Sequence, residues 1–446
     1  MQTGKPIDLS TVIAKIKDIQ LFMKNFYLLD FIEKNSNLNS KKLEILKYEL
    51  DTRMYYYGNQ FKKPYENKKQ KLSAVLVQYL KSAYVLLKVF QNKKVDNKKK
   101  AILSSSYFTV NDELSKLGFE VYSPSWNLKK DGNVLPDLKL FYSSKKILAT
   151  VNSSSFRDLL TPNFLSQIDE FEKKVVKAFQ KNKIKALIVS NDMTFIDRIL
   201  IDVCKKLKIP SFIFQHGLPP RYNLVDDNRT DYLIVWGDQL KENYIKTGFN
   251  KSKIIVSGHP YYKLKSELTL QFSLDNILVL TKSMNGGQHS DKVRLYDRSN
   301  SILYLFSIEK VLRSFGVLSV RLRLHPGENH EWYYKYINKE FFILDELNLE
   351  KSINSSTLVV GPTSTVFLES IYYHRNYLVY EPLVDGVDLF NFELIPPFDG
   401  SENKVPIAKN EVELIQLIKD KTIVDSSILS DYIRTPFDLE IIKKIV

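Results

Sequence analysis

From residue 101 onward, short apolar runs alternate with longer segments whose apolar residues recur at helical spacing. The segment 195–207, FIDRILIDVCKKL, has the spacing of an amphipathic helix, and PSFIFQ at 210–215 has the length of a buried strand. Six apolar runs follow this pattern: 101–106, 120–124, 185–190, 210–215, 231–237 and 253–258. Short apolar strands that alternate with helices predict a parallel sheet with helices on both of its faces.

A second series of the same kind begins after a polar stretch at 259–275. Its apolar runs lie within 276–287, 317–326, 341–346, 356–373 and 376–382. Near the N-terminus, 73–91 has helical spacing without Gly or Pro, and the lysine-rich 92–100 is typical of a solvated loop. We therefore predict an α/β chain with two Rossmann-like parallel-sheet domains, 101–265 and 266–446, after a helical N-terminal region, 1–100.

The composition of the 446 residues is that of a globular protein, with 44% hydrophobic and 26% charged residues. No apolar run approaches the roughly 18 residues of a membrane-spanning helix. The N-terminus lacks the apolar core of a cleavable signal peptide. The single cysteine, Cys204, excludes an intrachain disulfide, so a reducing, cytoplasmic setting is expected.

The net charge of +14 favours an anionic partner, whether nucleic acid, anionic lipid or a phosphate-bearing substrate. A genomic bias toward Asn, Lys and Ile would give the same excess without any partner. Because the lysines are scattered and no nucleic-acid-binding motif is present, no nucleic-acid partner is expected.

Ligands of open parallel sheets bind beyond the carboxyl ends of the strands. In the second series, the alternating run 320–324 ends at His325, and Pro326 stops the strand. An imidazole held there can donate a hydrogen bond to a phosphate or base oxygen. The alternative is a histidine packed in a turn, with Glu328 as a local cap or partner.

A turn of sequence GPTST begins at Gly361, directly after a buried strand. Its three hydroxyl residues, Thr363, Ser364 and Thr365, open a helix, where hydroxyls and free amides suit a phosphate. An ordinary helix cap, which is the alternative, needs only one hydroxyl. Glu369 lies one helical turn after Thr365, so both can face the same cleft.

The loop after the strand at 276–281 combines Lys282 and Ser283 with a glycine pair at 286–287. Its backbone amides could approach a phosphate, although the spacing is not that of a P-loop. A plain surface loop fits the same residues. No His, Cys or Asp-x-Asp pattern predicts a metal site.

In the first series, the stretch FQHG places Gln215, His216 and Gly217 at the end of a buried strand. His216 is a candidate base or sugar contact, and Gly217 would let the backbone approach a ligand. Asp192 follows another buried strand and is a candidate base or nucleophile, with a helix cap as the alternative. His259 repeats the His-Pro pattern, either lining a cleft or stiffening a hinge.

Two arginines of the same region, Arg198 and Arg221, could form planar forks on a carboxylate of the donor. Surface positions or salt bridges are the favoured interpretation of both.

Taken in order, these motifs resemble those of bacterial GT-B glycosyltransferases, in particular the sialyltransferase and capsule Kdo-transferase group that uses CMP-sugars. The His-Pro pair and the Ser/Thr pair after a Gly-Pro turn are similar to two motifs of the sialyltransferases. FQHG is similar to a Gln-His-Gly motif of the capsule Kdo-transferases. The passage 231–260 is similar to both the Kdo-transferases and the CDP-glycerol glycerophosphotransferases, and the resemblance covers roughly 185–380.

The resemblance implies a GT-B-like fold in which two Rossmann-like domains face a central cleft. It places the nucleotide on the C-terminal domain, with His325 at the phosphate or base, Ser364 and Thr365 at the phosphate and Glu369 at the ribose. The acceptor would bind the N-terminal domain. The acidic pair followed by Gly that supplies the base in sialyltransferases has no match at a strand end here, and Asp192 is the nearest substitute.

We therefore expect a metal-independent glycosyltransferase without a cofactor, which moves an acidic sugar, Kdo or a sialic-type nonulosonate, from CMP to a surface glycan or glycolipid. Catalysis is expected from Asp192 and His216. Donor contacts are expected from His325, Pro326, Gly361, Thr363, Ser364, Thr365, Glu369, Lys282 and Ser283, and sugar contacts from Gln215, Gly217 and His259. The alternative is a CDP-glycerol phosphotransferase or a UDP-sugar transferase. A basic face would allow peripheral association with an anionic membrane.

Overall fold

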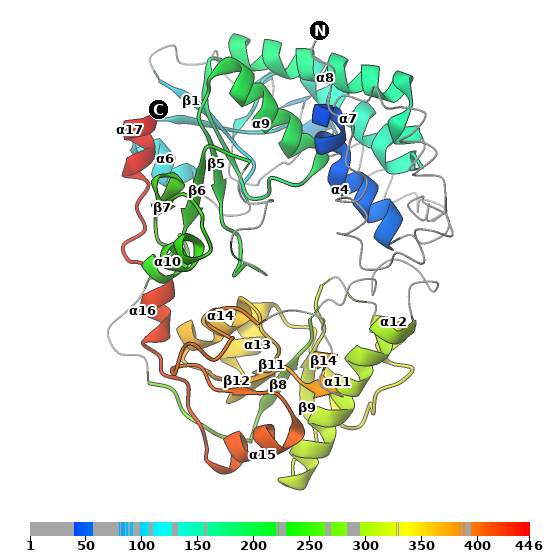
Figure 1. The fold of residues 1–446 in the computed structure, drawn as a ribbon, viewed down its shortest axis with the longest axis vertical. Helices are drawn as coiled ribbons and strands as arrows, with labels where there is room; N and C mark the ends of the chain where they lie inside the picture. The colour runs from blue at the N-terminus through cyan, green and yellow to red at the C-terminus, as the bar shows by residue number, and fades with distance from the viewer. Residues whose placement is uncertain are drawn as a thin grey trace.

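The computed structural model (Figure 1) shows two parallel sheets, one above the other, each with its own set of helices. It describes residues 40–56, 80, 82–84, 86–87, 90–91, 99–106, 110–126, 133–155, 158–219, 222, 229–263, 269–282, 295–326, 328, 330–384, 387–388 and 394–446. The predicted fold class, an α/β chain with two Rossmann-like domains, is confirmed.

The first sheet has seven strands in the order β3-β2-β1-β4-β5-β6-β7, all parallel. They are β1 (Ala101–Ser104), β2 (Glu120–Ser123), β3 (Asn133–Val134), β4 (Ile184–Val189), β5 (Ser211–Phe214), β6 (Tyr232–Val235) and β7 (Ile254–Val256). The strand order runs outward in opposite directions from β1 and β4, so the topological switch point lies between these two strands.

The helices of the first domain are α6 (Asn111–Lys116), α7 (Leu138–Ser153), α8 (Pro162–Lys181), α9 (Phe195–Leu207) and α10 (Asp238–Lys246). Helix α9 packs on β4, and α8 lies against both α7 and α9. Right-handed crossovers on either side of a switch point place the connecting helices on opposite faces of the sheet.

The second sheet has six strands in the order β10-β9-β8-β11-β12-β15, again parallel. They are β8 (Ile277–Leu280), β9 (Val320–Arg323), β10 (Phe342–Leu344), β11 (Leu358–Gly361), β12 (Asn376–Tyr380) and β15 (Ile407–Ala408), with a small hairpin of β13 (Leu383–Val384) and β14 (Val387–Asp388). Its helices are α11 (Leu295–Ser314), α12 (His330–Tyr333), α13 (Leu349–Asn354), α14 (Val366–Tyr372) and α15 (Glu411–Lys419). Here the switch point lies between β8 and β11.

The strands form where the sequence is apolar enough to be buried on both faces. All residues of β1, β5, β8 and β11 are buried. Strand β9 alternates instead, because Arg321 and Arg323 turn away from the core and both pair with Asp345, at 2.8 and 3.7 Å. The larger core is continuous from the first domain into the second, where it includes Phe367 and Tyr377.

Helix α4 (Ser40–Tyr56) belongs to the expected helical N-terminal region and packs on α9. Its Arg53 is fully buried and donates to the carbonyl oxygens of Val151 and Ser154 at the end of α7, at 2.5 and 3.0 Å. Arg198 of α9 pairs with Glu44 at 2.6 Å, so this arginine holds α4 rather than a donor carboxylate. Arg221 lies outside the described residues.

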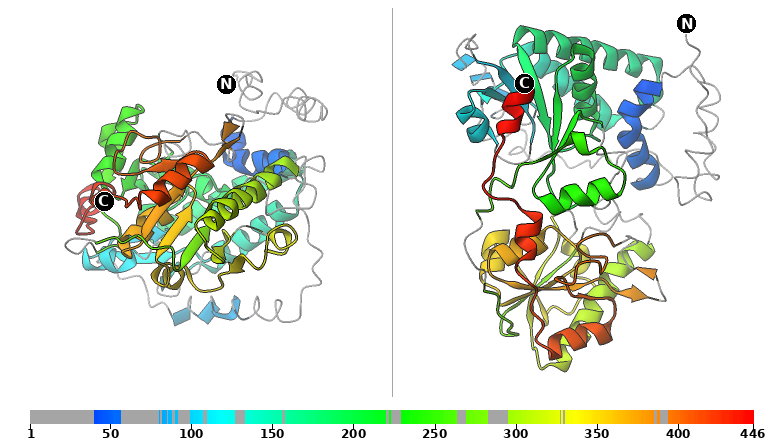
Figure 2. Two further views of the ribbon diagram at one scale, coloured as in Figure 1. Left: turned by 90° about the horizontal axis from the view of Figure 1, so that it is seen from below. Right: turned by 60° about the vertical axis from the view of Figure 1, so that its left-hand side comes forward.

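The C-terminal segment crosses back from the second domain to the first. Its helices α16 (Ile428–Tyr432) and α17 (Glu440–Ile445) appear in red in Figure 1 and in the right-hand view of Figure 2, where α16 lies at the junction, in contact with α10 and α14, and α17 lies beside the upper domain. The Arg434 amide donates to the Trp236 carbonyl oxygen at 2.8 Å. The returning backbone lies so close that a Cβ added at Gly237 would sit 2.3 Å from the Tyr432 carbonyl carbon. The Trp-Gly dipeptide therefore has a packing role.

Two constraints require glycine at position 258. Its φ is +80°, and a Cβ there would lie 2.4 Å from the Arg434 carbonyl oxygen. Gly316 has a matching φ of +79° but nothing within 4 Å of an added Cβ. We predict that Gly316→Ala costs only the left-handed conformation, about 1 kcal/mol of unfolding free energy. Gly258→Ala should cost at least ~2 kcal/mol more, because backbone must move.

Denaturant titrations of both variants measure this difference. Equal losses of stability in the two variants would show that the C-terminal segment does not depend on close approach at Gly258.

Candidate functional site

The loops at the carboxyl ends of the two sheets touch each other. The Leu218 amide, in the loop after β5, donates to Thr365 Oγ1, in the turn after β11, at 2.8 Å. A Cβ added at Gly217 would lie 2.9 Å from the same oxygen, so only glycine allows this approach. Gly217 was expected to admit a ligand, whereas in the structure it admits the other domain.

His216 stands at the exposed edge of the first sheet, next to this contact. Its Nδ1 donates to the Ser190 carbonyl oxygen at 2.9 Å, which leaves the lone pair of the neutral ring on Nε2. Partial desolvation lowers the pKa of His216 below 6.5, and the hydrogen bond to Ser190 opposes this shift. The ring is thus held neutral near pH 7, with the geometry of a base.

Gln215 is buried and braces the loop. Its side-chain Nε2 donates to the Gly217 carbonyl oxygen at 2.7 Å, and its backbone carbonyl oxygen accepts from Trp236 Nε1 at 2.8 Å. The side chain that was expected to contact a sugar is therefore used to shape the FQHG turn.

The turn from Gly361 to Thr365 lies at the second switch point. Thr363 donates from its amide and its hydroxyl to Glu381 Oε1, both at 2.5 Å, and Lys282 Nζ donates to Thr363 Oγ1 at 2.8 Å. Ser364 Oγ accepts from the Val366 amide at 3.3 Å. Each of the three hydroxyls expected at a phosphate thus has a partner within the chain, and α14 begins without a side-chain cap.

The side chain of Lys282 lies at the second switch point. Its ammonium lies between Thr363 and the buried Glu381, 3.4 Å from the carboxylate. It was predicted from the loop after β8, together with Ser283, which lies outside the described residues. Its place between β8 and β11 fits an anionic ligand beyond the strand ends.

His325 and Pro326 are exposed at the end of β9, beside β8. The His325 amide donates to both Thr281 Oγ1 and Glu328 Oε2 at 2.9 Å, so these two side chains fix the backbone of the turn. Partial burial lowers the pKa of His325. Glu328 is the local partner that the sequence suggested.

Asp192 is buried and forms an ion pair with Arg229, with Nη1 and Oδ1 3.5 Å apart. The Arg229 amide also donates to it at 3.3 Å. The alternative interpretation of Asp192 as a helix cap is wrong, because Thr194 caps α9. An enclosed carboxylate paired with an arginine is also a poor match for a base that must reach a substrate.

His259 lies buried between aromatic rings at the interdomain hinge. It stacks on Tyr262 at 4.2 Å and meets Trp236 edge-on at 4.6 Å, and Tyr262 in turn contacts Tyr372 of α14. Burial lowers its pKa to about 3. A neutral, enclosed ring of this kind supports the hinge rather than a sugar.

Glu369 of α14 is half-buried, and its pKa is raised by desolvation and by the nearby Glu350, against the opposing charge of Arg323. The carboxyl is thus within electrostatic reach of Arg323 on β9 and also of Tyr262, beside the interdomain hinge. Among the described contacts, no hydrogen bond joins the Glu369 carboxyl to Thr365.

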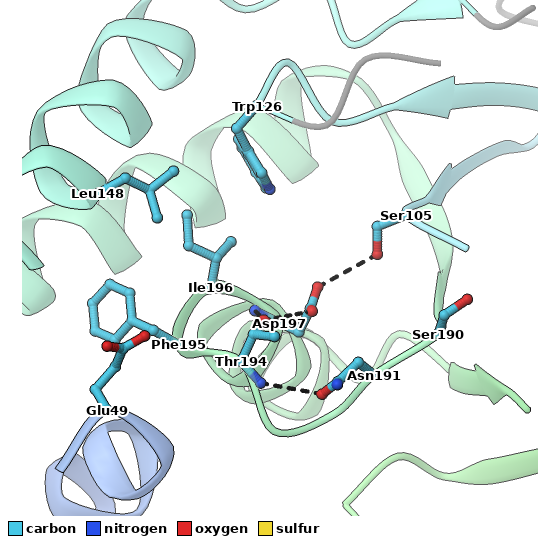
Figure 3. A pocket seen from close by; sticks show the side chains of 10 residues that line it. All are labelled: Glu49, Ser105, Trp126, Leu148, Ser190, Asn191, Thr194, Phe195, Ile196 and Asp197. Atoms are coloured by element: carbon cyan, nitrogen blue, oxygen red, sulfur yellow. Dashed lines mark hydrogen bonds between the residues drawn. The ribbon is translucent and has the colours of Figure 1, made fainter. Parts of the chain in front are cut away.

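A cavity that the sequence did not reveal lies at the first switch point (Figure 3). Its volume is about 260 Å³, and its lining comes from the ends of β1, β2 and β4, from the start of α9 and from α4 and α7. The carboxylate of Asp197, on α9, points into it. This carboxylate accepts hydrogen bonds from Thr194 Oγ1 at 2.6 Å and from Ser105 Oγ at 3.4 Å. Ser190, whose carbonyl binds His216, lines the same cavity.

Desolvation raises the pKa of Asp197 to about 6, and the two hydroxyl hydrogen bonds only partly offset this. A Thr-x-x-Asp pattern after a strand, here Thr194 to Asp197, was the available signal. It reads as an ordinary capping box, which is why the sequence pointed to Asp192 instead.

Among the residues described, no group of three or more His, Cys, Asp or Glu side chains could hold a metal ion. No helix of the described part of the chain is long and apolar enough to cross a membrane.

No protein-family model matches the chain. Two curated proteins are similar in sequence: the small ribosomal subunit protein uS4c of Stigeoclonium helveticum, 24% identical over 289 residues, and the Rho GTPase-activating protein gacE of Dictyostelium discoideum, 26% identical over 151 residues. These matches cover 61% and 34% of this chain but only 9% and 12% of the relatives' own lengths. They define no family.

Among solved structures, the chain is similar to UDP-GlcNAc 2-epimerase from Neisseria meningitidis, with 12% identity, 77% and 98% of the two chains covered and a TM-score of 0.40. The lipopolysaccharide outer core galactosyltransferase WaaB is 10% identical, with 78% of this chain and 98% of WaaB covered and a TM-score of 0.41. The wall teichoic acid polymerase TagF is 11% identical, with 84% of this chain and 95% of TagF covered and a TM-score of 0.37. Similarities this low transfer no activity, and the fold class stands on the two sheets themselves.

Glu328 offers a test of the electrostatics beneath His325. Burial raises its pKa from 4.5 to about 7, although Thr281, Tyr333 and the His325 amide all donate to it. A carboxyl with a raised folded-state pKa contributes stability that is complete below pH 4.5 and is lost as the pH rises through 7. Glu328→Gln, which cannot ionise, should therefore gain on the order of 2 kcal/mol relative to the wild type between pH 5 and pH 8.

Denaturant titrations at the two pH values measure this gain, with the exposed Glu346→Gln as the control. Parallel stability curves for wild type and Glu328→Gln would contradict a buried, titrating Glu328.

Proposed function

We propose that this protein is a glycosyltransferase of GT-B architecture, which transfers a sugar from a nucleotide-activated donor to an acceptor hydroxyl. The observation that carries the proposal is the Leu218–Thr365 contact, since it joins a strand-end loop of the first sheet, next to β4, to the turn at the switch point of the second sheet. In doubly wound sheets ligands bind at these points, and sites between domains are common. Two such sites opening on one junction suit a reaction between two substrates.

Of the two domains, the second offers the more suitable binding site for an anionic nucleotide donor. Lys282, His325 and Thr363 follow three adjacent strands, β8, β9 and β11, and Lys282 bridges the switch point. A lysine and an exposed histidine at one sheet edge supply donors for a phosphate. The turn residues from Gly361 to Thr365 would act mainly by shaping this edge.

The donor that we propose is a CMP-activated acidic sugar, either Kdo or a sialic-type nonulosonate. The support for this choice is the resemblance of His325-Pro326 and Ser364-Thr365 to motifs of CMP-sugar users. The acceptor would be a glycan or glycolipid, and a basic chain could work at an anionic membrane surface.

Binding of nucleotides tests both levels of the proposal. CMP should raise the melting temperature in a concentration-dependent way, more than CDP or UDP at the same concentration, because ligand binding stabilises the folded state by mass action. Stabilisation by UDP or CDP alone would overturn the CMP donor and favour a UDP-sugar or CDP-glycerol enzyme. No stabilisation by any of the three at millimolar concentration would overturn the function.

Removing the cation at the second switch point should weaken that binding. Lys282→Met is expected to raise the Kd for CMP by about 10- to 100-fold, the effect of losing one charged hydrogen bond. Titration calorimetry measures the Kd, and Lys310→Met is the matched control, because Lys310 is an exposed lysine that pairs with Glu411. An unchanged Kd in Lys282→Met would contradict a phosphate at this edge.

A further inference from the structure

The cavity at the first switch point has two unlike walls (Figure 3). Leu148, Phe195 and Ile196 form one side, and Trp126 reaches in from the loop after β2. The opposite side is polar and consists of Ser105, Ser190, Asn191 and Thr194, with the Asp197 carboxylate between the two. A sugar ring has the complementary character, with an apolar face of C–H groups and a rim of hydroxyls.

The size of the cavity limits what it can hold. About 260 Å³ is just below the ~300–1,000 Å³ of pockets that take drug-sized ligands. One ring fits such a volume, and the rest of a longer glycan would extend outside it.

The charges around the cavity select against an anion. None of the side chains that line it is a Lys, Arg or His. Glu49 lines it from α4 and is already paired with the buried Arg53 at 2.6 Å. Asp197 is hydrogen-bonded only to hydroxyls in the described contacts. A carboxylate or phosphate on the ligand would thus meet a carboxylate without a compensating cation.

We propose that this cavity binds the acceptor as a single uncharged sugar ring and that Asp197 accepts the proton of the hydroxyl that reacts. The inference rests on the glycosyltransferase function proposed above and adds the acceptor class and the base. As the acceptor oxygen bonds to the anomeric carbon of the donor, its proton passes to an Asp197 oxygen. The bond between that carbon and the nucleotide's phosphate oxygen breaks, and its electron pair leaves with the nucleotide.

The cavity is connected to the donor side by a short run of contacts. Ser190 lines it and accepts from His216, and the same loop reaches Thr365 through Leu218. An acceptor hydroxyl directed from the cavity toward this loop therefore points to the side of the first domain that contacts the turn after β11, where Thr363 accepts from Lys282.

The titration of Asp197 suits this role. Desolvation raises its pKa to about 6, so the carboxylate is ionised at neutral pH yet basic enough to take a proton. The titratable or charged groups around it are Glu49 with Arg53 from α4, and His216 beyond Ser190. Trp126 and Leu148, from the β2 loop and α7, are uncharged.

A purely structural Asp197 would only complete the cap of α9 with Thr194. Asp197→Asn separates the two roles, because the amide oxygen can still accept from Thr194 and the NH2 group can donate to the Ser105 hydroxyl, but the amide cannot accept a proton at neutral pH. Asp202→Asn is the matched control, since Asp202 lies on the same helix and pairs with Lys41 outside the cavity, at 3.6 Å.

The turnover experiment measures transfer from CMP-Kdo, CMP-sialic acid and UDP-N-acetylglucosamine to neutral methyl glycosides across pH 5 to 8. Wild-type kcat/KM should fall as the pH drops through about 6, because the base becomes protonated. Asp197→Asn should lose about 10²- to 10⁴-fold in kcat and also lose this pH limb, with nucleotide affinity unchanged. Asp202→Asn should match the wild type. Transfer by Asp197→Asn within threefold of wild type would overturn the assignment.

Binding of the ring is tested by ligand-observed NMR with the nucleotide present. Methyl galactoside, methyl glucoside and N-acetylglucosamine should bind better than glucuronate or galactose 6-phosphate, and Trp126→Leu should weaken them at least tenfold. Equal or tighter binding of the two anions, or no binding of any neutral ring, would overturn the acceptor class. If the protein binds no nucleotide, the proposed glycosyltransferase function is contradicted. If it binds nucleotide but no neutral ring, only the proposal for the acceptor cavity is contradicted.

Discussion

The hydrogen bond from the Leu218 amide to the Thr365 hydroxyl joins the strand-end loops of the two sheets directly. It is possible only because Gly217 has no side chain to hold the loops apart. The C-terminal segment reinforces the same arrangement from the side, where Gly237 and Gly258 let its backbone lie directly on the first domain. Gly217 thus lets a loop of the first domain touch the second domain, and Gly237 and Gly258 let the returning C-terminal segment touch the first.

The sequence predicted the strands because their burial is a local property of the chain. Runs such as ILVL at β8 and LVVG at β11 are apolar throughout, and the structure buries all of their residues. It also identified the strand ends, including His216 and His325. It could not show what each end residue pairs with, because the partners are distant in sequence: Asp192 meets Arg229, 37 residues away, and Thr365 meets Leu218, 147 residues away. The expected roles of Gln215 and His259 changed for the same reason, since each is enclosed by residues of other elements.

The carboxylates illustrate how such partners decide function. Asp192 and Asp197 lie five residues apart at the end of the same strand, yet Asp192 is neutralised by an arginine and Asp197 is bound by hydroxyls. An ion pair favours the charged form of a carboxyl, whereas desolvation with neutral donors raises its pKa toward neutrality. The second environment is that of Asp197, whose pKa it raises to about 6. The sequence pointed to Asp192, which is nearer to the strand, but the carboxylate that lines the cavity is Asp197, inside helix α9.

The two switch points differ in charge, and this difference can sort the substrates. The second sheet presents Lys282 and His325, and its carboxylates, Glu328 and Glu381, lie buried beneath hydrogen-bond donors. The cavity of the first sheet has two carboxylates, Glu49 and Asp197, and no cation among its lining residues. Under the proposed function, an anionic nucleotide would favour the side of the junction that carries Lys282. Under the proposed function, an uncharged acceptor ring can then occupy its cavity without competition from the donor, even though both substrates enter the same junction.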